Sequence, residues 1–175
     1  MDSSTRLLYV IIAWASFLTI VVVGAYSIVE AYLFHNPEPV GYYLVNVEWP
    51  LSYFAKPVSY FSIACVALFY SGLRLWEERI SRWPRVVLYL LQSVGFLVAF
   101  GSAYEVIYNF MVWGALFSAI CSHAVSCPIS PDSISTVFSQ IPWNLDFATK
   151  VFTALFVISG YSVYYLRRLT KNTLI

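Results

Sequence analysis

The sequence predicts an all-α polytopic membrane protein with four transmembrane helices. Its composition, its long apolar runs and the placement of its basic residues support this fold class. Of the 175 residues, 60% are hydrophobic and only 11% are charged, whereas soluble domains are roughly 25% charged. So few charges cannot cover a soluble body of this size. The net charge of +1 supplies no basic field for nucleic acid. The expected partners are therefore the lipid bilayer and other membrane protein subunits.

The spans follow from the length of the apolar runs. A helix needs about 20 mostly apolar residues to cross a hydrocarbon core roughly 30 Å thick. Four stretches qualify, namely residues 7–34, 58–76, 86–120 and 145–166. Pro57 suits the first turn of the second span. In the fourth, Asn144 is a candidate N-cap, and Arg167 and Arg168 are expected to close the helix. We predict a single domain, residues 1–175.

The basic residues predict the topology. Eight of the ten flank the spans on one side: Arg6, Arg74, Arg79, Arg82, Arg85, Arg167, Arg168 and Lys171. Only Lys56 and Lys150 fall on the other side. Because positively charged flanks stay in the cytoplasm, we predict a multi-pass protein of the cell membrane with both termini cytoplasmic. The first apolar run is far longer than the roughly 7–15 residues of a signal-peptide core, so we interpret it as a transmembrane helix.

The three connections differ in length and character. The link EERISRWPR is short and charged, so helices 58–76 and 86–120 are expected to be antiparallel neighbours. The loop 35–57 is rich in Tyr and Trp around Glu48, which suits a segment lying in the headgroup layer. In the loop 121–143, Asp132 is a candidate cap for a short surface helix that ends near Gln140.

Two of the three cysteines lie on the predicted outer side. Cys121 and Cys127 flank the sequence SHAVS, in a compartment where disulfides persist. We predict that they are bridged and clip the second long loop; a redox-active pair and two free thiols are the alternatives. Cys65 lies in the middle of the second span and is expected to be a small core residue.

Glu105 is an ionisable residue inside the third span, which by default marks a candidate functional site. It lies twenty residues after Arg85, about 30 Å along a helix, at the outer boundary of the hydrocarbon core. Glu30 lies about 35 Å from Arg6 by the same rise. The sequence therefore predicts two carboxylates at a common depth beneath the outer surface.

Helical spacing places polar neighbours beside both carboxylates. Tyr26 lies one turn before Glu30, while Tyr108 and Asn109 lie one turn after Glu105. Small residues would let another helix approach closely there: Ala99, Gly101, Ser102 and Ala103. We predict one polar cluster with members from three helices: Tyr26, Glu30, Glu105, Tyr108, Asn109, Asp146 and Lys150.

Three functions fit such a cluster. In the first, Glu105 is satisfied by polar side chains and the cluster fixes helix packing or docks another subunit. In the second, Glu30 and Glu105 line a site for a quinone headgroup, a proton or another small ligand. In the third, the carboxylates join His35 or His123 to bind a metal ion, although the sequence has no HxxxH pair to preorganise the ligands.

Catalytic motifs are absent from the sequence. It contains no GxSxG, P-loop, HExxH or Gly-rich dinucleotide pattern. We therefore expect an accessory subunit of a larger membrane complex, such as an energy-transducing or redox complex, without a cofactor of its own. The alternative is a small quinone-binding or oxidoreductase component that uses Glu30 and Glu105.

Overall fold

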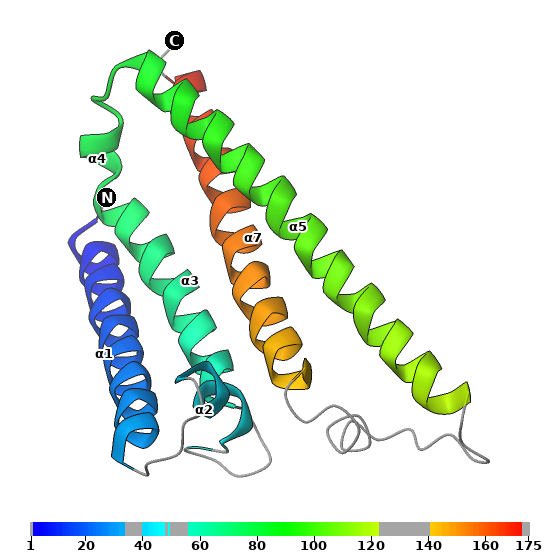
Figure 1. Ribbon diagram of the computed structural model, residues 1–175. Helices are drawn as coiled ribbons and strands as arrows, with labels where there is room; N and C mark the ends of the chain where they lie inside the picture. The colour runs from blue at the N-terminus through cyan, green and yellow to red at the C-terminus, as the bar shows by residue number, and fades with distance from the viewer. Residues whose placement is uncertain (1, 34–39, 48, 50–55, 123–140, 173–175) are drawn as a thin grey trace.

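The computed structural model describes residues 2–33, 40–47, 49, 56–122 and 141–172. Within these residues the chain is helical and contains no strand. The helices are α1 (Ser3–Leu33), α2 (Val40–Asn46), α3 (Pro57–Leu75), α4 (Glu77–Ile80), α5 (Arg85–Ser122) and α7 (Ile141–Asn172), as Figure 1 shows.

In the described part of the chain, 4 helices are long and apolar enough to cross a membrane. They are α1 over Ser3–Leu33, α3 over Pro57–Leu75, α5 over Arg85–Ala119 and α7 over Asn144–Lys171. The prediction of an all-α chain with four membrane-spanning helices is confirmed at this level. Pro57 occupies the first turn of α3 as predicted, where its missing N–H leaves no helical hydrogen bond unmade.

The start of α7 differs from the prediction. The helix begins at Ile141, so Asn144 lies inside its first turn and is not the N-cap. Pro142 accounts for the earlier start, because proline at the first helical positions supplies a helical φ and lacks only an N–H that would have no partner there.

The end of α7 also differs. Arg167 and Arg168 were expected to close the helix, but it continues to Asn172. Arginine and leucine are good helix formers, and the sequence from 167 to 172 contains neither the glycine nor the proline that usually ends a helix.

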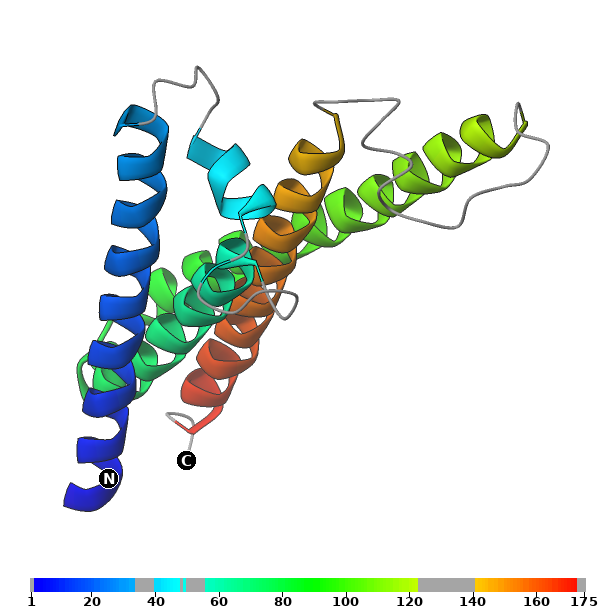
Figure 2. The same cartoon turned by 90° about the horizontal axis from the view of Figure 1, so that it is seen from below.

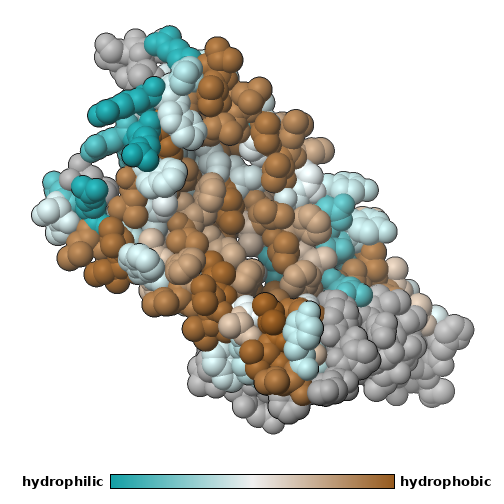
Figure 3. Space-filling model, turned by 60° about the vertical axis from the view of Figure 1, so that its left-hand side comes forward, coloured by the Kyte–Doolittle hydropathy of each residue, from teal (hydrophilic) through white to brown (hydrophobic). Residues whose placement is uncertain are grey.

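The long helices alternate in direction, so the starts of α1 and α5 and the ends of α3 and α7 lie at one end of the molecule (Figure 1). We call this the basic end, because it carries eight of the ten basic residues. The opposite end, where α3 and α7 begin, is called the loop end. Figure 3 shows hydrophilic residues gathered around α4 at the basic end and apolar residues over the middle of the molecule.

The helices pack in the order α1, α3, α7, α5. Among the described residues α3 contacts α1 and α7, α5 packs only on α7, and α3 and α5 do not contact each other. The expectation that helices 58–76 and 86–120 are packed neighbours is therefore wrong. The reason lies in the link, where Ile80 of α4 is buried in one core cluster with residues of α5 and α7, among them Leu88 and Leu166. The connection thus crosses the end of α7 and leaves that helix between its neighbours.

The interface between α5 and α7 follows a seven-residue repeat. The α5 residues at this spacing are Leu88, Gly95, Ser102 and Asn109, of which all except Gly95 are buried. A Cβ at Gly95 would lie 3.1 Å from Cγ2 of Val163 and 3.7 Å from the carbonyl oxygen of Ser159. The close helix approach that small residues allow is therefore centred on Gly95, whereas Gly101 has nothing within 4 Å.

A helical segment of the first long loop packs into the bundle at the loop end. The short helix α2 contacts α1, α3 and α7 and buries Tyr43, Leu44 and Val45. Leu44 and Val45 form a core cluster with Val23 of α1 and Val58 of α3. This part of the Tyr- and Trp-rich loop therefore packs against three of the long helices, and its position in the headgroup layer stays a prediction.

Candidate functional site

Glu30 lies near the end of α1, half-buried beside aromatic side chains. The Tyr26 phenol one turn earlier interacts with its carboxylate. The Tyr26 ring also stacks on Trp49, with ring centroids 5.0 Å apart and planes 13° from parallel. The part of the predicted cluster on α1 therefore forms, and Trp49, which follows α2, packs against it.

Glu105 lies on α5 and is half-buried. Nothing in the described part of the chain makes a hydrogen bond or an ion pair with its carboxylate. Tyr104 and Tyr108 stack on each other, with ring centroids 6.4 Å apart, and are 61% and 51% exposed. Asn109 is only 5% exposed, and its side-chain nitrogen has no hydrogen-bond partner. Among the residues that the structure describes, the Glu105 carboxylate and the Asn109 side-chain nitrogen are thus left without polar partners.

The structure does not bring the Glu30 and Glu105 parts of the predicted cluster together. Among the described residues α1 and α5 make no contact with each other, because α3 and α7 lie between them. Figures 1 and 2 show α1 and the loop end of α5 at opposite sides of the molecule. A shared depth along two helices fixes a residue's height but not the face of the bundle on which it lies. Glu30 and Glu105 therefore do not line a common site in this arrangement.

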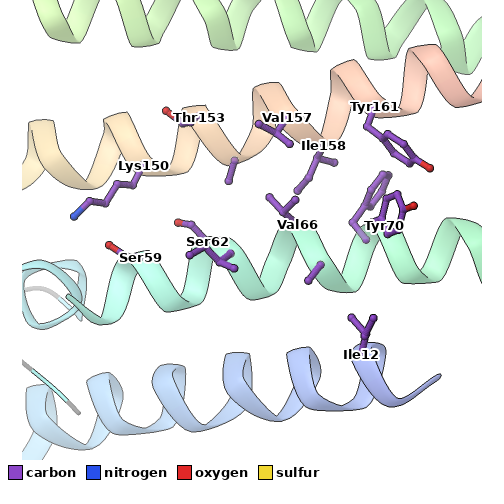
Figure 4. A pocket seen from close by; sticks show the side chains of 14 residues that line it. Ile12, Ser59, Ser62, Val66, Tyr70, Lys150, Thr153, Val157, Ile158 and Tyr161 are labelled. Atoms are coloured by element: carbon purple, nitrogen blue, oxygen red, sulfur yellow. The ribbon is translucent and has the colours of Figure 1, made fainter. Parts of the chain in front are cut away.

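The remaining two members of the predicted cluster, Asp146 and Lys150, pair with each other within α7. Lys150 Nζ lies 3.0 Å from Oδ2 of Asp146 one turn earlier, and both side chains are about one-third exposed or less. Thr149 and Thr153 donate their hydroxyl protons to the carbonyl oxygens one turn before them, at 2.7 Å. Among the described residues, neither Asp146 nor Lys150 contacts Glu30 or Glu105. The Lys150 side chain points toward the start of α3 (Figure 4).

A groove runs between α3 and α7 and was not predicted from the sequence (Figure 4). Its volume is about 720 Å³. Ser59, Ser62 and Lys150 line its loop end, and Tyr70 and Tyr161 line its basic end. The walls between these ends are apolar: Ile63, Val66, Ala67, Ala154, Val157 and Ile158. The exposed lining of the groove is therefore almost entirely apolar, and its few polar side chains lie toward the two ends.

At the basic end of the groove, an arginine is held among tyrosines. The Arg74 guanidinium lies 5.7 Å from the Tyr70 ring centroid and 5.8 Å from that of Tyr165, within cation–π range. Its Nη1 lies 3.5 Å from Oε2 of Glu77. Tyr70 also contacts Tyr161, with ring centroids 4.9 Å apart.

This cluster connects three helices, because the Tyr9 ring of α1 lies 5.9 Å from that of Tyr70. From the sequence, Arg74 was interpreted only as one of the basic residues that indicate the cytoplasmic side. Two pairs at helical spacing could have indicated this cluster: Tyr70 and Arg74 on α3, and Tyr161 and Tyr165 on α7.

Several sequence predictions lie outside the described residues. They are the surface helix from Asp132 to Gln140, the metal ligands His35 and His123, and Cys127 of the predicted disulfide. Within the described ranges, no three His, Cys, Asp or Glu side chains gather in a way that would hold a metal ion. Cys65 is a free thiol in α3 and is only partly buried, so it is not one of the core residues as had been predicted.

Comparisons with known proteins identify no relative: no protein-family model, curated protein or solved structure matches this chain.

Proposed function

We propose that this chain is an integral membrane subunit of a larger membrane protein complex, with a structural or accessory role rather than a catalytic one. The observation that carries the proposal is Glu105, a carboxylate on a membrane-length helix with no hydrogen bond or ion pair to any described residue. An ionisable side chain within a span is costly unless it is paired, by about 2.5–3.5 kcal/mol at the bilayer centre and by less at the outer boundary of the hydrocarbon core, where Glu105 is predicted to lie. A second polypeptide is the natural source of that partner.

The arrangement of α5 supports this proposal. The helix has 38 residues, about 57 Å of length, and packs only on α7 among the described helices. The two views show the loop end of α5 diverging from the start of α7 (Figures 1 and 2). Polar side chains between membrane helices hydrogen-bond across the interface. We infer that Tyr104, Glu105 and Tyr108 receive a helix of the partner subunit.

The proposal includes the topology and the disulfide. The basic end is assigned to the cytoplasm on the basis of its eight basic residues, which places the Cys121–Cys127 disulfide outside. A protease applied to sealed right-side-out vesicles should leave a tag at the C-terminus intact. Cleavage of the tag under those conditions would reverse the orientation.

Photo-crosslinking from α5 tests the subunit proposal. A photoreactive amino acid at Tyr104 in the native membrane should yield an adduct with another polypeptide. The same residue at Leu90, which is 64% exposed on the basic half of α5, is the matched control and should yield mainly lipid adducts. After mild detergent extraction, the chain should migrate with a much larger assembly than its own 19.9 kDa. Migration as a free chain, with no adduct from Tyr104, would contradict the proposal.

A further inference from the structure

The groove between α3 and α7 has the chemistry of a ligand site that differs from the predicted carboxylate cluster. We propose that it binds a neutral amphiphile with a carbonyl-bearing ring and a long apolar tail, a class represented by the isoprenoid quinones. The ring would lie at the loop end beside Lys150, Ser59 and Ser62, and the tail would run toward Tyr70 and Tyr161.

The loop end of the groove offers hydrogen-bond donors. A lysine ammonium has three N–H donors, and Asp146 receives one of them at 3.0 Å. Most serines and threonines of α7 donate to a backbone carbonyl of their own helix. The Ser59 and Ser62 hydroxyls, by contrast, make no hydrogen bond within the described residues, and Figure 4 shows them on the groove side of α3. Donors of this kind call for an acceptor on the ligand.

Charge favours a neutral headgroup over a phosphate. The Asp146 carboxylate neutralises the Lys150 ammonium, and Lys150 is the one charged residue among the described residues that line the groove. A phosphate or carboxylate headgroup would be repelled by Asp146 and would lack a net countercharge. Ketone oxygens need only hydrogen-bond donors, which Lys150 and the two serines supply.

The size and the walls of the groove fit a chain-like tail. A volume of about 720 Å³ falls within the roughly 300–1,000 Å³ usual for small-molecule sites. The distance from Lys150 to Tyr161 is about 16 Å along α7, and the walls in between are mostly aliphatic; the hydroxyl of Thr153, which also lines the groove, donates to its own helix. Some of its lining residues, such as Ile63 and Val157, are exposed on the surface of the spans, so a lipid-soluble ligand can enter from the bilayer.

The direct test is binding of a decyl-tailed benzoquinone to the purified chain in phosphatidylcholine nanodiscs, measured by isothermal titration calorimetry. Saturable binding to one site is expected. Lys150→Met should weaken it roughly tenfold to hundredfold, since a hydrogen bond from a charged donor is lost, while Lys171→Met at the basic end should leave it unchanged. Equal affinity in both variants would overturn the proposal.

A second pair of variants separates the groove from the general surface of the spans. Ala154→Trp places a large ring in the groove and should abolish quinone binding. Ala115→Trp adds the same ring at an exposed position of α5 and should not affect it. If phosphatidylglycerol displaces the quinone from the wild-type chain at equal concentration, the groove is a general lipid site and the proposal fails.

A photoreactive azidoquinone avoids dependence on variant folding. With the wild-type chain, the label should appear in peptides of α3 or α7, near Ser59, Ser62 or Lys150. Labelling confined to α1 or α5 would overturn the assignment of the site. Neither result depends on whether Glu105 docks a partner subunit, so the two proposals can fail separately.

Discussion

The Tyr165 hydroxyl donates a hydrogen bond of 3.2 Å to the backbone carbonyl oxygen of Leu73. This bond connects the end of α7 to the end of α3, where the last turn of α3 has carbonyls without intrahelical donors. Tyr165 is only 2% exposed and also packs in the core cluster with Leu88 and Leu166. It thereby joins the helix pair α1 and α3 to the pair α5 and α7.

The first prediction concerns this bond. Tyr165→Phe keeps the ring but leaves the Leu73 carbonyl without its donor, so the free energy of unfolding in detergent micelles should fall by about 1 kcal/mol. Tyr164→Phe is the matched control, because that neighbouring side chain is 64% exposed and should have little effect. Equal losses in the two variants would show that the hydroxyl at 165 has no special role.

The second prediction ranks the two interactions of Arg74. Its ring contacts with Tyr70 and Tyr165 are each worth roughly 0.5–1 kcal/mol or more, so Arg74→Met should lower the free energy of unfolding by about 1–2 kcal/mol. Glu77→Gln should cost at most about 0.5 kcal/mol, since the Glu77 side chain is 43% exposed and solvent screens such pairs.

A double-mutant cycle is the control for this ranking. Arg74→Met combined with Tyr70→Leu should be less destabilising than the sum of the two single changes, because one contact is lost twice. A larger loss in Glu77→Gln than in Arg74→Met would mean that the ion pair dominates.

The third prediction concerns the closest approach of α5 and α7. Gly95→Leu must displace Val163, and overpacking of this kind typically costs about 1–3 kcal/mol. Gly114→Leu should be neutral or stabilising, because a Cβ there meets nothing within 4 Å and leucine is the better helix former. Thermal unfolding of both variants in the same detergent measures the difference. If both variants melt alike, the close approach at Gly95 would lose its support.

The fourth prediction concerns the three cysteines. If Cys121 and Cys127 are bridged, an alkylating reagent added to the denatured, unreduced protein should modify Cys65 alone. After reduction it should modify all three residues, and the mass spectrum counts them directly. Three modified residues without reduction would rule out the disulfide.

Much of the fold followed from one-dimensional patterns. The four spans were visible because a lipid core demands about 20 apolar residues in a row, and Pro57 marked the start of α3 because proline fits only the first helical turn. The ends of the helices were predicted less accurately. At α7 the sequence suggested a stop at Arg167 and Arg168, but charge at a helix end is only a preference and does not prevent another turn.

For the candidate site, contacts within one helix were predicted correctly and contacts between helices were not. Local pairs were correctly foreseen where both members lie on one helix, as with Tyr26 and Glu30 or Asp146 and Lys150, because a helix places residues four apart on one face. The meeting of Glu30 with Glu105 depended on which helices are neighbours. That choice depended on Gly95 admitting α7 and on Ile80 of α4 packing over the end of α7.

The sequence by itself thus determined the class of molecule, its apolar helices and the polar pairs within each helix, because these are set by composition and by a fixed helical repeat. Only the tertiary structure decided that α7 separates α3 from α5 and that a groove opens between α3 and α7. The physical reason is that several faces of a membrane helix are equally apolar, so the choice among them depends on shape complementarity between side chains far apart in the chain.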